Sequence, residues 1–204
     1  MPIQDVLRIS ILRSLYYSLR FKGKMIVFRG TRIRLERGAR IEIAPHGRLV
    51  LGRQLSGSRC AVRVNRNGRL IIGGEVAVSR GAQVRVFADA TIEIGDGTFI
   101  NLDTTISAKE RITIGAHCSI SWNVNILDGN FHDLIIREVT WPKTTPVEIG
   151  DNVWIGTGVT IVGASIGDAA VLGAGSMVSS TVPAKELVTG NPGQVVMEDV
   201  SWVF

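Results

Sequence analysis

The sequence predicts an all-β fold in which the chain winds into a solenoid with flat faces. Two observations support this prediction. Aliphatic residues return at every sixth position, a period that fits neither a helix nor a simple alternating strand; such ladders are Ile72-Val78-Val84, Ile94-Ile100-Ile106, Ile114-Ile120-Ile126 and Ile149-Ile155-Ile161. An aliphatic–glycine pair also recurs, mostly about 20 residues apart, as expected for one coil of a solenoid; these pairs are Leu51-Gly52, Ile72-Gly73, Ile94-Gly95, Ile114-Gly115, Ile149-Gly150 and Ile166-Gly167.

The composition fits a narrow aliphatic core. Of the 204 residues, 45% are hydrophobic, but only 6% are aromatic and 23 are glycine. A large globular core would use more aromatic side chains, whereas tight corners favour glycine. We therefore expect one elongated domain.

Cysteine content and hydropathy indicate the compartment. Cys60 and Cys118 are too few for a disulfide framework and favour a reducing environment. No apolar run reaches the length of a membrane span, and Arg8 and Arg13 interrupt any signal-peptide core. We expect a cytoplasmic protein, placed at the inner face of the cytoplasmic membrane if its basic half contacts lipid.

Charge is divided unevenly along the chain. Residues 1–90 contain 18 Lys and Arg against 5 Asp and Glu, a net charge of +13, whereas residues 91–204 contain 5 against 13, a net charge of −8. The basic half is either a solvated surface or a binding surface for an anionic partner, such as a membrane or an acidic glycan. Nucleic acid is disfavoured, because few aromatic residues accompany the arginines to stack on bases.

The predicted organisation has three parts. Residues 1–25 form an N-terminal cap with an amphipathic helix over 3–20, which Gly23 would end; its apolar positions are Leu7, Ile11, Leu15 and Leu19. This helix covers the open end of the solenoid, lies on a bilayer, or does both. Residues 26–182 form the solenoid, interrupted by an inserted loop at 128–147, and residues 183–204 leave it as an exit segment.

The C-terminal half carries motifs of a known family. The segments VEIGDNVWIG (147–156), IGDAAVLGAGSMV (166–178) and GNPGQVV (190–196) resemble the hexapeptide-repeat acyltransferases, and the six-step ladders extend this resemblance over roughly 40–195. The resemblance implies a left-handed parallel β-helix, a homotrimer and acetyl-CoA as the acyl donor. IGDGTFINLDTTI (94–106) and the loop histidine are similar to galactoside-acetyltransferase-type sugar O-acetyltransferases. The basic N-terminal part is more similar to enzymes that acetylate bacterial cell-envelope polysaccharides.

His132 is the predicted general base. It lies in the inserted loop, in DGNFHD, where the resemblance places the catalytic histidine of the family. A sugar hydroxyl is a poor nucleophile at neutral pH, so acyl transfer from a thioester needs a base that titrates near neutrality. Asp128, four residues earlier, is a candidate to orient the imidazole or to bind the acceptor.

Two further segments supply candidates for acceptor binding and oxyanion stabilisation. By resemblance, Asn101 contacts acceptor hydroxyls, although it could equally form a corner turn, and Asp103 is a second candidate on the same segment. Trp154 matches a tryptophan that packs near the acceptor, where an aromatic face suits a pyranose, or it simply packs on the coil. The backbone N–H of Thr157 would stabilise the thioester oxyanion.

The acetyl-CoA site is predicted beside the small residues of the last coils. Gly156 and Thr157, together with Gly173, Ala174 and Gly175, would let the pantetheine arm approach the backbone. The missing residue between Ile161 and Ile166 falls in this region and is expected to reshape the wall of the groove. The family's exit pattern G-x-P-A is followed by a basic residue; here Pro192 is followed by Gly193 and Gln194, so Lys185 is the remaining candidate for the CoA phosphates.

These residues predict direct acetyl transfer to a sugar, polysaccharide or lipid-linked glycan hydroxyl, without an acyl-enzyme. Two alternatives remain open: N-acetylation of an amino sugar or antibiotic, and a non-catalytic solenoid that binds glycans or membranes. A three-histidine metal site of the γ-carbonic anhydrase type would need His46, His117 and His132 together, and Trp122 stands where an H-x4-H pair would place its second histidine. No metal is predicted.

Overall fold

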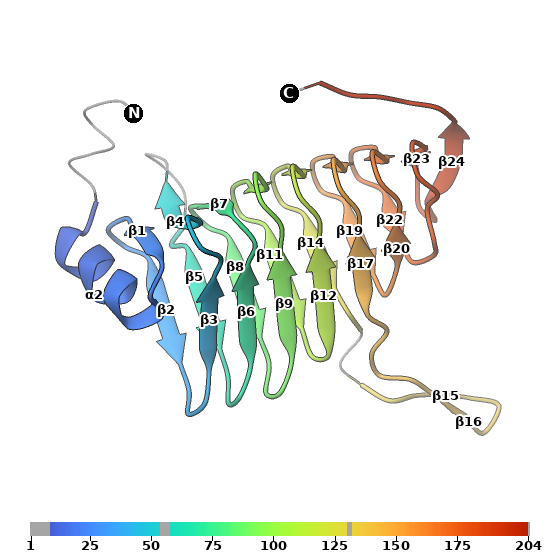
Figure 1. The fold of residues 1–204 in the computed structure, drawn as a ribbon. Coiled ribbons are helices and arrows are strands. Elements are labelled where there is room, and N and C mark those ends of the chain that lie inside the picture. The colour runs from blue at the N-terminus through green and yellow to red at the C-terminus, as the bar shows by residue number, and fades with distance from the viewer. Residues whose placement is uncertain (1–8, 54–57, 130–131, 204) are drawn as a thin grey trace.

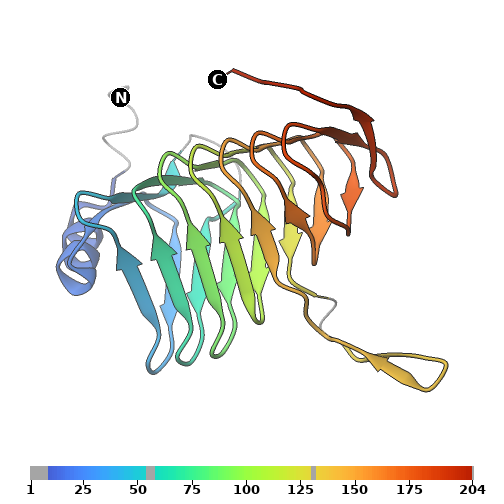
Figure 2. The same ribbon diagram turned by 45° about the vertical axis from the view of Figure 1, so that its right-hand side comes forward.

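Because the aliphatic ladder advances six residues at a time, the chain turns after each short strand and winds into a three-sided coil (Figure 1). This computed structural model describes residues 9–53, 58–129 and 132–203. Successive coils stack along one axis from the N-terminal helix to the C-terminal segment, and the three faces are three sheets (Figures 1 and 2).

Each face is a sheet of stacked strands, and the strands between coils are parallel. Sheet 1 contains β1 (Lys24–Val27), β4 (Arg48–Arg53), β7 (Glu75–Ser79), β10 (Phe99–Ile100), β13 (Ser119–Ile120), β18 (Trp154–Ile155), β21 (Val171–Leu172), β23 (Leu187–Thr189) and the antiparallel β24 (Gln194–Met197). Sheet 2 contains β2 (Arg32–Leu35), β5 (Ala61–Val64), β8 (Gln83–Val86), β11 (Thr105–Ala108), β14 (Asn125–Leu127), β19 (Thr160–Val162) and β22 (Met177–Val178). Sheet 3 contains β3 (Arg40–Ile43), β6 (Arg69–Ile72), β9 (Thr91–Ile94), β12 (Arg111–Ile114), β17 (Val147–Ile149) and β20 (Ser165–Ile166).

The core consists of inward-facing aliphatic side chains stacked in register. In sheet 3, one such column is Ile72, Ile94, Ile114, Ile149 and Ile166, each at most 3% exposed. Burying each isoleucine contributes roughly 1.5–3 kcal/mol, so the column is a main source of stability. The predicted six-residue ladders are therefore confirmed as the core of a parallel β-helix.

The corners between sheets form three edges that run along the coil. Edge 1 joins sheet 1 to sheet 2 and includes residues 101–104, 121–124, 156–159 and 173–176. Edge 2 joins sheet 2 to sheet 3 and includes 109–110, the inserted segment 128–146, 163–164 and 179–181. Edge 3 joins sheet 3 to sheet 1 and includes 95–98, 115–118, 150–153, 167–170 and 183–186. Left-handed backbone conformations recur at these corners, at Asp103 and Asn152 as well as at glycines.

The N-terminal helix α2 (Ile11–Phe21) covers the first coil with the side that contains Ser14, Tyr17, Ser18 and Phe21. The hydroxyl oxygens of Ser14 and Ser18 accept the N–H groups of Val27 and Met25 at 2.9 Å each. These N–H groups lie on the exposed side of edge strand β1, so the helix caps the open end of sheet 1. The part of the expected helix before residue 9, including Leu7, lies outside the described residues.

The end of α2 differs from the expectation. The helix ends at Phe21, and Lys22 rather than Gly23 takes the left-handed cap conformation, with φ of 51°. Gly23 is instead required by packing, because a Cβ there would lie 2.6 Å from the Cβ of Ile43. None of the described helices is long and apolar enough to cross a bilayer.

Candidate functional site

Edge 1 brings several of the predicted site residues into one column. The carbonyl oxygens of Leu102, Trp122 and Thr157 accept N–H groups from the next coil, at 3.0, 2.9 and 2.8 Å, from Asn123, Gly158 and Gly175 respectively. Leu102, Trp122, Thr157 and Ala174 therefore occupy equivalent corner positions. Asn101 and Asp103 flank the first of them, and Gly156, Gly173 and Gly175 flank the last two.

The glycines of edge 1 allow close stacking of the corners. A Cβ on Gly156 would lie 2.7 Å from the backbone nitrogen of Ala174, so a larger residue would push the two coils apart. A Cβ on Gly175 would meet no heavy atom within 4 Å, and its φ is +73°. Gly175 is thus open to solvent, as an approaching pantetheine arm would require.

Thr157 presents an unused backbone donor. It is half-buried at the second position of a turn closed by the Val159 N–H to the Gly156 oxygen, at 3.4 Å, with Gly158 at φ 71°. Among the described residues no acceptor receives the Thr157 N–H. Trp122 and Ala174 share this feature, so the free donor is a property of the corner rather than of the threonine.

Asn101 and Asp103 lie at the first of these corners. The Asn101 side-chain oxygen accepts the Leu102 N–H at 2.9 Å, which is the corner-turn role weighed from the sequence. Its amide nitrogen is left for another partner, since a primary amide offers two donors. Asp103 is exposed and has φ of 56°.

Trp154 projects from the outer face of sheet 1, and the residue that covers it was not anticipated. It is 42% exposed, and its ring lies 6.2 Å from that of Trp202, centroid to centroid. The Trp202 indole N–H donates to the Asn152 oxygen at 2.6 Å, which holds the C-terminal segment against the sheet. Trp202 also lines a cavity of about 340 Å³ with Phe99, His117 and Ser119.

Trp122 is a second aromatic residue that the sequence interpretation passed over. It is 49% exposed and lies on edge 1, directly between the corners of Leu102 and Thr157. Its signal was present in the sequence, because it follows Ile120 by two residues, as Thr157 follows Ile155. Trp122 therefore lies at the corner next to Thr157 along edge 1, whereas Trp154 lies on sheet 1 against Trp202.

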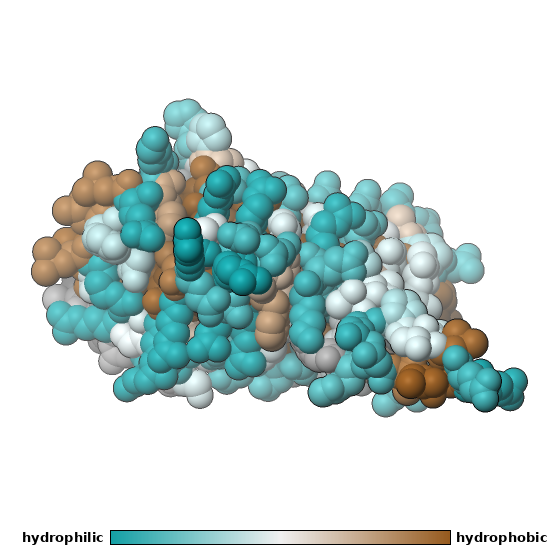
Figure 3. Space-filling model, turned by 90° about the horizontal axis from the view of Figure 1, so that it is seen from below, coloured by the Kyte–Doolittle hydropathy of each residue, from teal (hydrophilic) through white to brown (hydrophobic). Residues whose placement is uncertain are grey.

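His132 lies on a different edge, in an arm that leaves the coil after β14. The arm contains the hairpin β15 (Leu134–Ile136) and β16 (Val139–Trp141), which projects away from the coil (Figures 1 and 2). His132 is exposed. The hairpin is apolar and unpartnered in one chain: Ile135, Val139 and Trp141 are 66%, 61% and 53% exposed. Figure 3 shows this hydrophobic surface at one end of the molecule and that of α2 at the other.

Asp128 anchors the base of the arm. Its side chain is fully buried, and its carboxylate accepts the N–H groups of Lys109, Glu110 and Arg111 at 2.6–3.0 Å. Its own carbonyl oxygen accepts the Thr145 N–H at 2.6 Å, where the arm returns. A buried carboxylate already bonded to three amides is not available to an acceptor, so the structure favours an anchoring role over the acceptor contact suggested by the sequence.

The shortened corner between Ile161 and Ile166 lies beneath this arm rather than beside the glycines of edge 1. The Gly163 N–H donates to the Leu127 oxygen at 3.1 Å, and a Cβ on Gly163 would lie 2.8 Å from the Cβ of Thr145. The expectation that this corner lies beside the glycines of edge 1 is therefore wrong, because within one chain it packs against the returning arm.

Lys185 lies away from the glycine corners of edge 1, whereas Pro192 lies in the turn that stacks on the last of them. Lys185 is exposed on edge 3, where its N–H donates to the Asp168 oxygen at 2.8 Å. Pro192 lies in the turn between β23 and β24. Within one chain Lys185 does not share an edge with Thr157. The turn that contains Pro192 continues edge 1, because the Met177 N–H donates to the Gly190 oxygen at 2.9 Å and the Gly193 N–H donates to the Met177 oxygen at 2.7 Å.

Both cysteines are free and buried in the core. Burial raises the pKa of the Cys60 thiol to about 12 and that of the Cys118 thiol to about 11. Both thiols are therefore protonated at neutral pH and neither can act as a thiolate nucleophile. In the described part of the chain, no three His, Cys, Asp or Glu side chains gather as a metal site would require.

Comparison with known proteins agrees with this architecture. Residues 146–180 match the family model described as the hexapeptide repeat of succinyl-transferase. The galactoside O-acetyltransferase of Escherichia coli K12 is 35% identical over 111 residues, covering 53% of this chain and 55% of that protein. WcaF of the same organism, assigned to colanic acid biosynthesis as an acetyltransferase, is 36% identical over 110 residues, covering 53% and 59%. The chain thus spans little more than half the length of these relatives.

Solved structures extend the likeness to the fold. A hexapeptide-repeat acetyltransferase from Vibrio cholerae, in complex with acetyl-CoA, is 34% identical, with a TM-score of 0.50 over 57% of this chain and 64% of that one. The polysialic acid O-acetyltransferase OatWY has a TM-score of 0.53 over 85% and 91%, at 19% identity, which shows a shared fold alone. These matches define a left-handed parallel β-helix built from hexapeptide repeats. Over little more than half of its length, the chain is similar to hexapeptide-repeat acetyltransferases.

Proposed function

We propose that this protein transfers the acetyl group of acetyl-CoA to a hydroxyl of a cell-surface polysaccharide or lipid-linked glycan. The observation that carries the proposal is the division of the site: an exposed histidine on an apolar arm at edge 2, and an unused backbone donor beside solvent-open glycines at edge 1. The relatives named as galactoside and colanic acid acetyltransferases support the substrate class.

In the proposed reaction, His132 removes the proton from the acceptor hydroxyl as its oxygen attacks the thioester carbonyl. The backbone N–H of Thr157 stabilises the negative charge that develops on the carbonyl oxygen. The carbon–sulfur bond then breaks, CoA leaves as the thiolate, and the proton held by His132 neutralises it. Asn101 and Trp122 are placed to orient the acceptor.

The divided site implies more than one copy of the chain. His132 lies on edge 2 of the solenoid and Thr157 lies on edge 1. The apolar hairpin beside His132 has no packing partner within the described chain. We propose a homotrimer in which the arm of one copy covers edge 1 of its neighbour, so that each site takes residues from two chains. This assembly would bury the hairpin and bring the base to the donor.

A membrane-associated location accompanies this proposal. The outer side of α2 exposes Ile11, Leu15 and Leu19 at 75%, 57% and 72%, and residues 9–35 contain seven Lys and Arg and no Asp or Glu. An exposed apolar helix face in a basic surround suits the anionic inner face of the cytoplasmic membrane. The helix would then both cap the coil and contact lipid.

The first test replaces the proposed base. His132→Asn should lower kcat by roughly 10²–10⁴-fold without changing the melting temperature, because the side chain lies outside the coil. The readout is free-thiol release from acetyl-CoA, screened across nucleotide sugars, oligosaccharides, lipid-linked glycans and amino sugars. His46→Asn is the matched control, since His46 has φ of 66° at an exposed turn and asparagine tolerates that conformation.

Two results would overturn the assignment. Full activity of the His132→Asn variant would remove His132 from the mechanism. Thiol release with amino sugars alone would replace hydroxyl acetylation with N-acetylation.

A further inference from the structure

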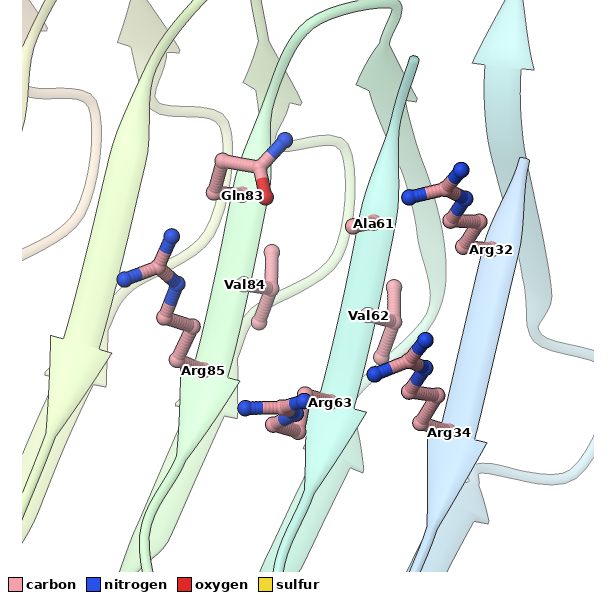
Figure 4. Close-up of a pocket in the computed structure, with 8 residues that line it drawn as sticks. All are labelled: Arg32, Arg34, Ala61, Val62, Arg63, Gln83, Val84 and Arg85. Carbon is pink, nitrogen blue, oxygen red and sulfur yellow. The ribbon is translucent and has the colours of Figure 1, made fainter. Parts of the chain in front are cut away.

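The outer face of sheet 2 changes character along the coil. At its N-terminal end, Arg32 and Arg34 on β2, Arg63 on β5 and Arg85 on β8 line a shallow pocket of about 270 Å³ (Figure 4). Further along, the equivalent outward positions hold Thr105, Ser107, Asn125 and Leu127. The basic half of the sequence thus produces one concentrated surface rather than a uniform one.

Three of these arginines stand in one row. Arg34, Arg63 and Arg85 are register partners in adjacent strands, so their Cα atoms are about 4.8 Å apart. All three side chains are exposed. Among the described residues none of them forms an ion pair or a side-chain hydrogen bond.

On the other two faces, several outward arginines form ion pairs with glutamates. On sheet 1 Arg48 pairs with Glu75, and on sheet 3 Arg69 pairs with Glu42 and Arg111 with Glu148, each glutamate coming from a neighbouring strand. Cross-strand compensation is therefore available to this fold and is missing from the arginine row. Like charges opposite one another in a sheet are destabilising, so the row opposes folding unless an anion neutralises it.

The row also has a direction. Arg34, Arg63 and Arg85 are continued in the same register position by Ser107, which is buried, and by the partly buried Leu127. Leu127 immediately precedes Asp128, the anchor of the arm that carries His132. From Arg85 to Leu127 is two strand spacings, about 10 Å. A chain lying along the row would reach the base of the arm.

We propose that the arginine row binds carboxylate or phosphate groups of an anionic polysaccharide acceptor and guides the chain toward His132. This inference rests on the proposed function and names its acceptor class. An extended polyanion fits a straight row of evenly spaced guanidinium groups on a flat face. A bilayer is disfavoured there, because the adjoining outward positions are Ala61, Gln83 and Thr105, none of which is a large apolar side chain that could insert.

The test measures binding without turnover. A fluorescently labelled, size-defined polyglucuronic acid oligomer is titrated with wild-type protein, with the row variant R34Q/R63Q/R85Q, and with R29Q/R37Q/R40Q. The second triple lowers net charge equally and alters exposed arginines outside the row. The row variant should bind about tenfold more weakly or worse, with a flatter salt dependence, while the control stays close to wild type. A neutral dextran oligomer of equal length should not bind.

Melting temperatures show whether a loss of oligomer binding comes from unfolding of the row variant. At low ionic strength the row variant should melt at the same temperature as wild type or higher, since a repulsive array has been removed. The polyanion should raise the melting temperature of wild type but not of the row variant. Equal loss of binding in both triple variants, or no loss in the row variant, would overturn the proposal. Row-dependent binding to phosphatidylglycerol vesicles, with oligomer binding unaffected, would overturn it in favour of a membrane.

The proposed function can fail separately. If oligomer binding depends on the row but no anionic glycan is acetylated, the proposed binding role of the row is supported and the proposed activity is contradicted. If a neutral glycan is acetylated and oligomer binding does not depend on the row, the proposed activity is supported and the proposed binding role of the row is contradicted.

Discussion

At the scale of single residues, the backbone of Thr157 offers a sharp test of the oxyanion site. Its N–H has no acceptor among the described residues, and it occupies the second position of a turn with Gly158 at positive φ, where proline is favoured. Thr157→Pro should therefore delete one donor and break no internal hydrogen bond. We expect kcat to fall roughly 10²–10³-fold, with the melting temperature unchanged or slightly raised.

Ala88 supplies the matched control for this substitution. It occupies the equivalent position of a turn at edge 2, closed by the Ala90 N–H to the Phe87 oxygen, with Asp89 at φ 61°. Ala88→Pro should leave both activity and stability near wild type. Unchanged kcat in Thr157→Pro, measured with saturating acetyl-CoA, would show that the oxyanion is stabilised elsewhere.

Residue roles were only partly predictable from the sequence. The six-residue period places Ile155 in the core and predicts a corner at Gly156, because burial follows the repeat. It cannot show that Asp128 is buried against the amides of 109–111, since these contacts join residues 17–19 positions apart. Nor can it show that Trp202 returns to cover Trp154, 48 positions earlier in the chain.

At the scale of elements, α2 gives a testable membrane contact. Its inner side is fixed by Ser14 and Ser18, whereas Leu15 and Leu19 point to solvent. The double variant L15S/L19S should lose binding to vesicles that contain phosphatidylglycerol, while the fold is unaffected, because neither leucine packs on the coil. Vesicle co-sedimentation measures this loss.

The control for α2 removes similar apolar surface elsewhere. V196S/M197S alters two exposed residues of β24, at 52% and 60% exposure, at the opposite end of the coil. Its vesicle binding should equal that of wild type. Equal binding by L15S/L19S would assign the apolar face of α2 to another partner. The helical periodicity predicted the apolar stripe, but it could not show that the serine side faces the protein.

At the scale of the whole molecule, mixing two inactive variants tests whether the site is shared between chains. His132→Asn and Thr157→Pro damage different edges, so in a mixed trimer some sites would combine an intact arm with an intact neighbouring edge 1. Random mixing should restore about a quarter of wild-type activity. A site contained within one chain would regain none, because every chain carries a defect. Co-refolded mixtures, checked as trimers by light scattering, provide the measurement.

The overall architecture was the most predictable level. The ladders and the recurring aliphatic–glycine pairs specify a coil because every turn places its aliphatic residues at the same inward-facing positions. The repeats do not predict the apolar hairpin at 134–141, which is exposed and has no packing partner among the described residues; the proposed trimer would cover it. The sequence therefore predicts the fold closely, but it predicts little of how the candidate site residues come together.

The stacking of coils from α2 toward the arm has a consequence for distance. Between β2 and β14, sheet 2 advances by four strand spacings, about 19 Å. If α2 rests on the bilayer with the basic end of the coil toward the lipid, the coil becomes a ruler that holds His132 at a set height. A glycan anchored in that bilayer would then be acetylated at the sugar unit that reaches this height, whatever its neighbours. Inserting or deleting one complete coil between β5 and β11 should move the modified unit along the glycan by a matching length.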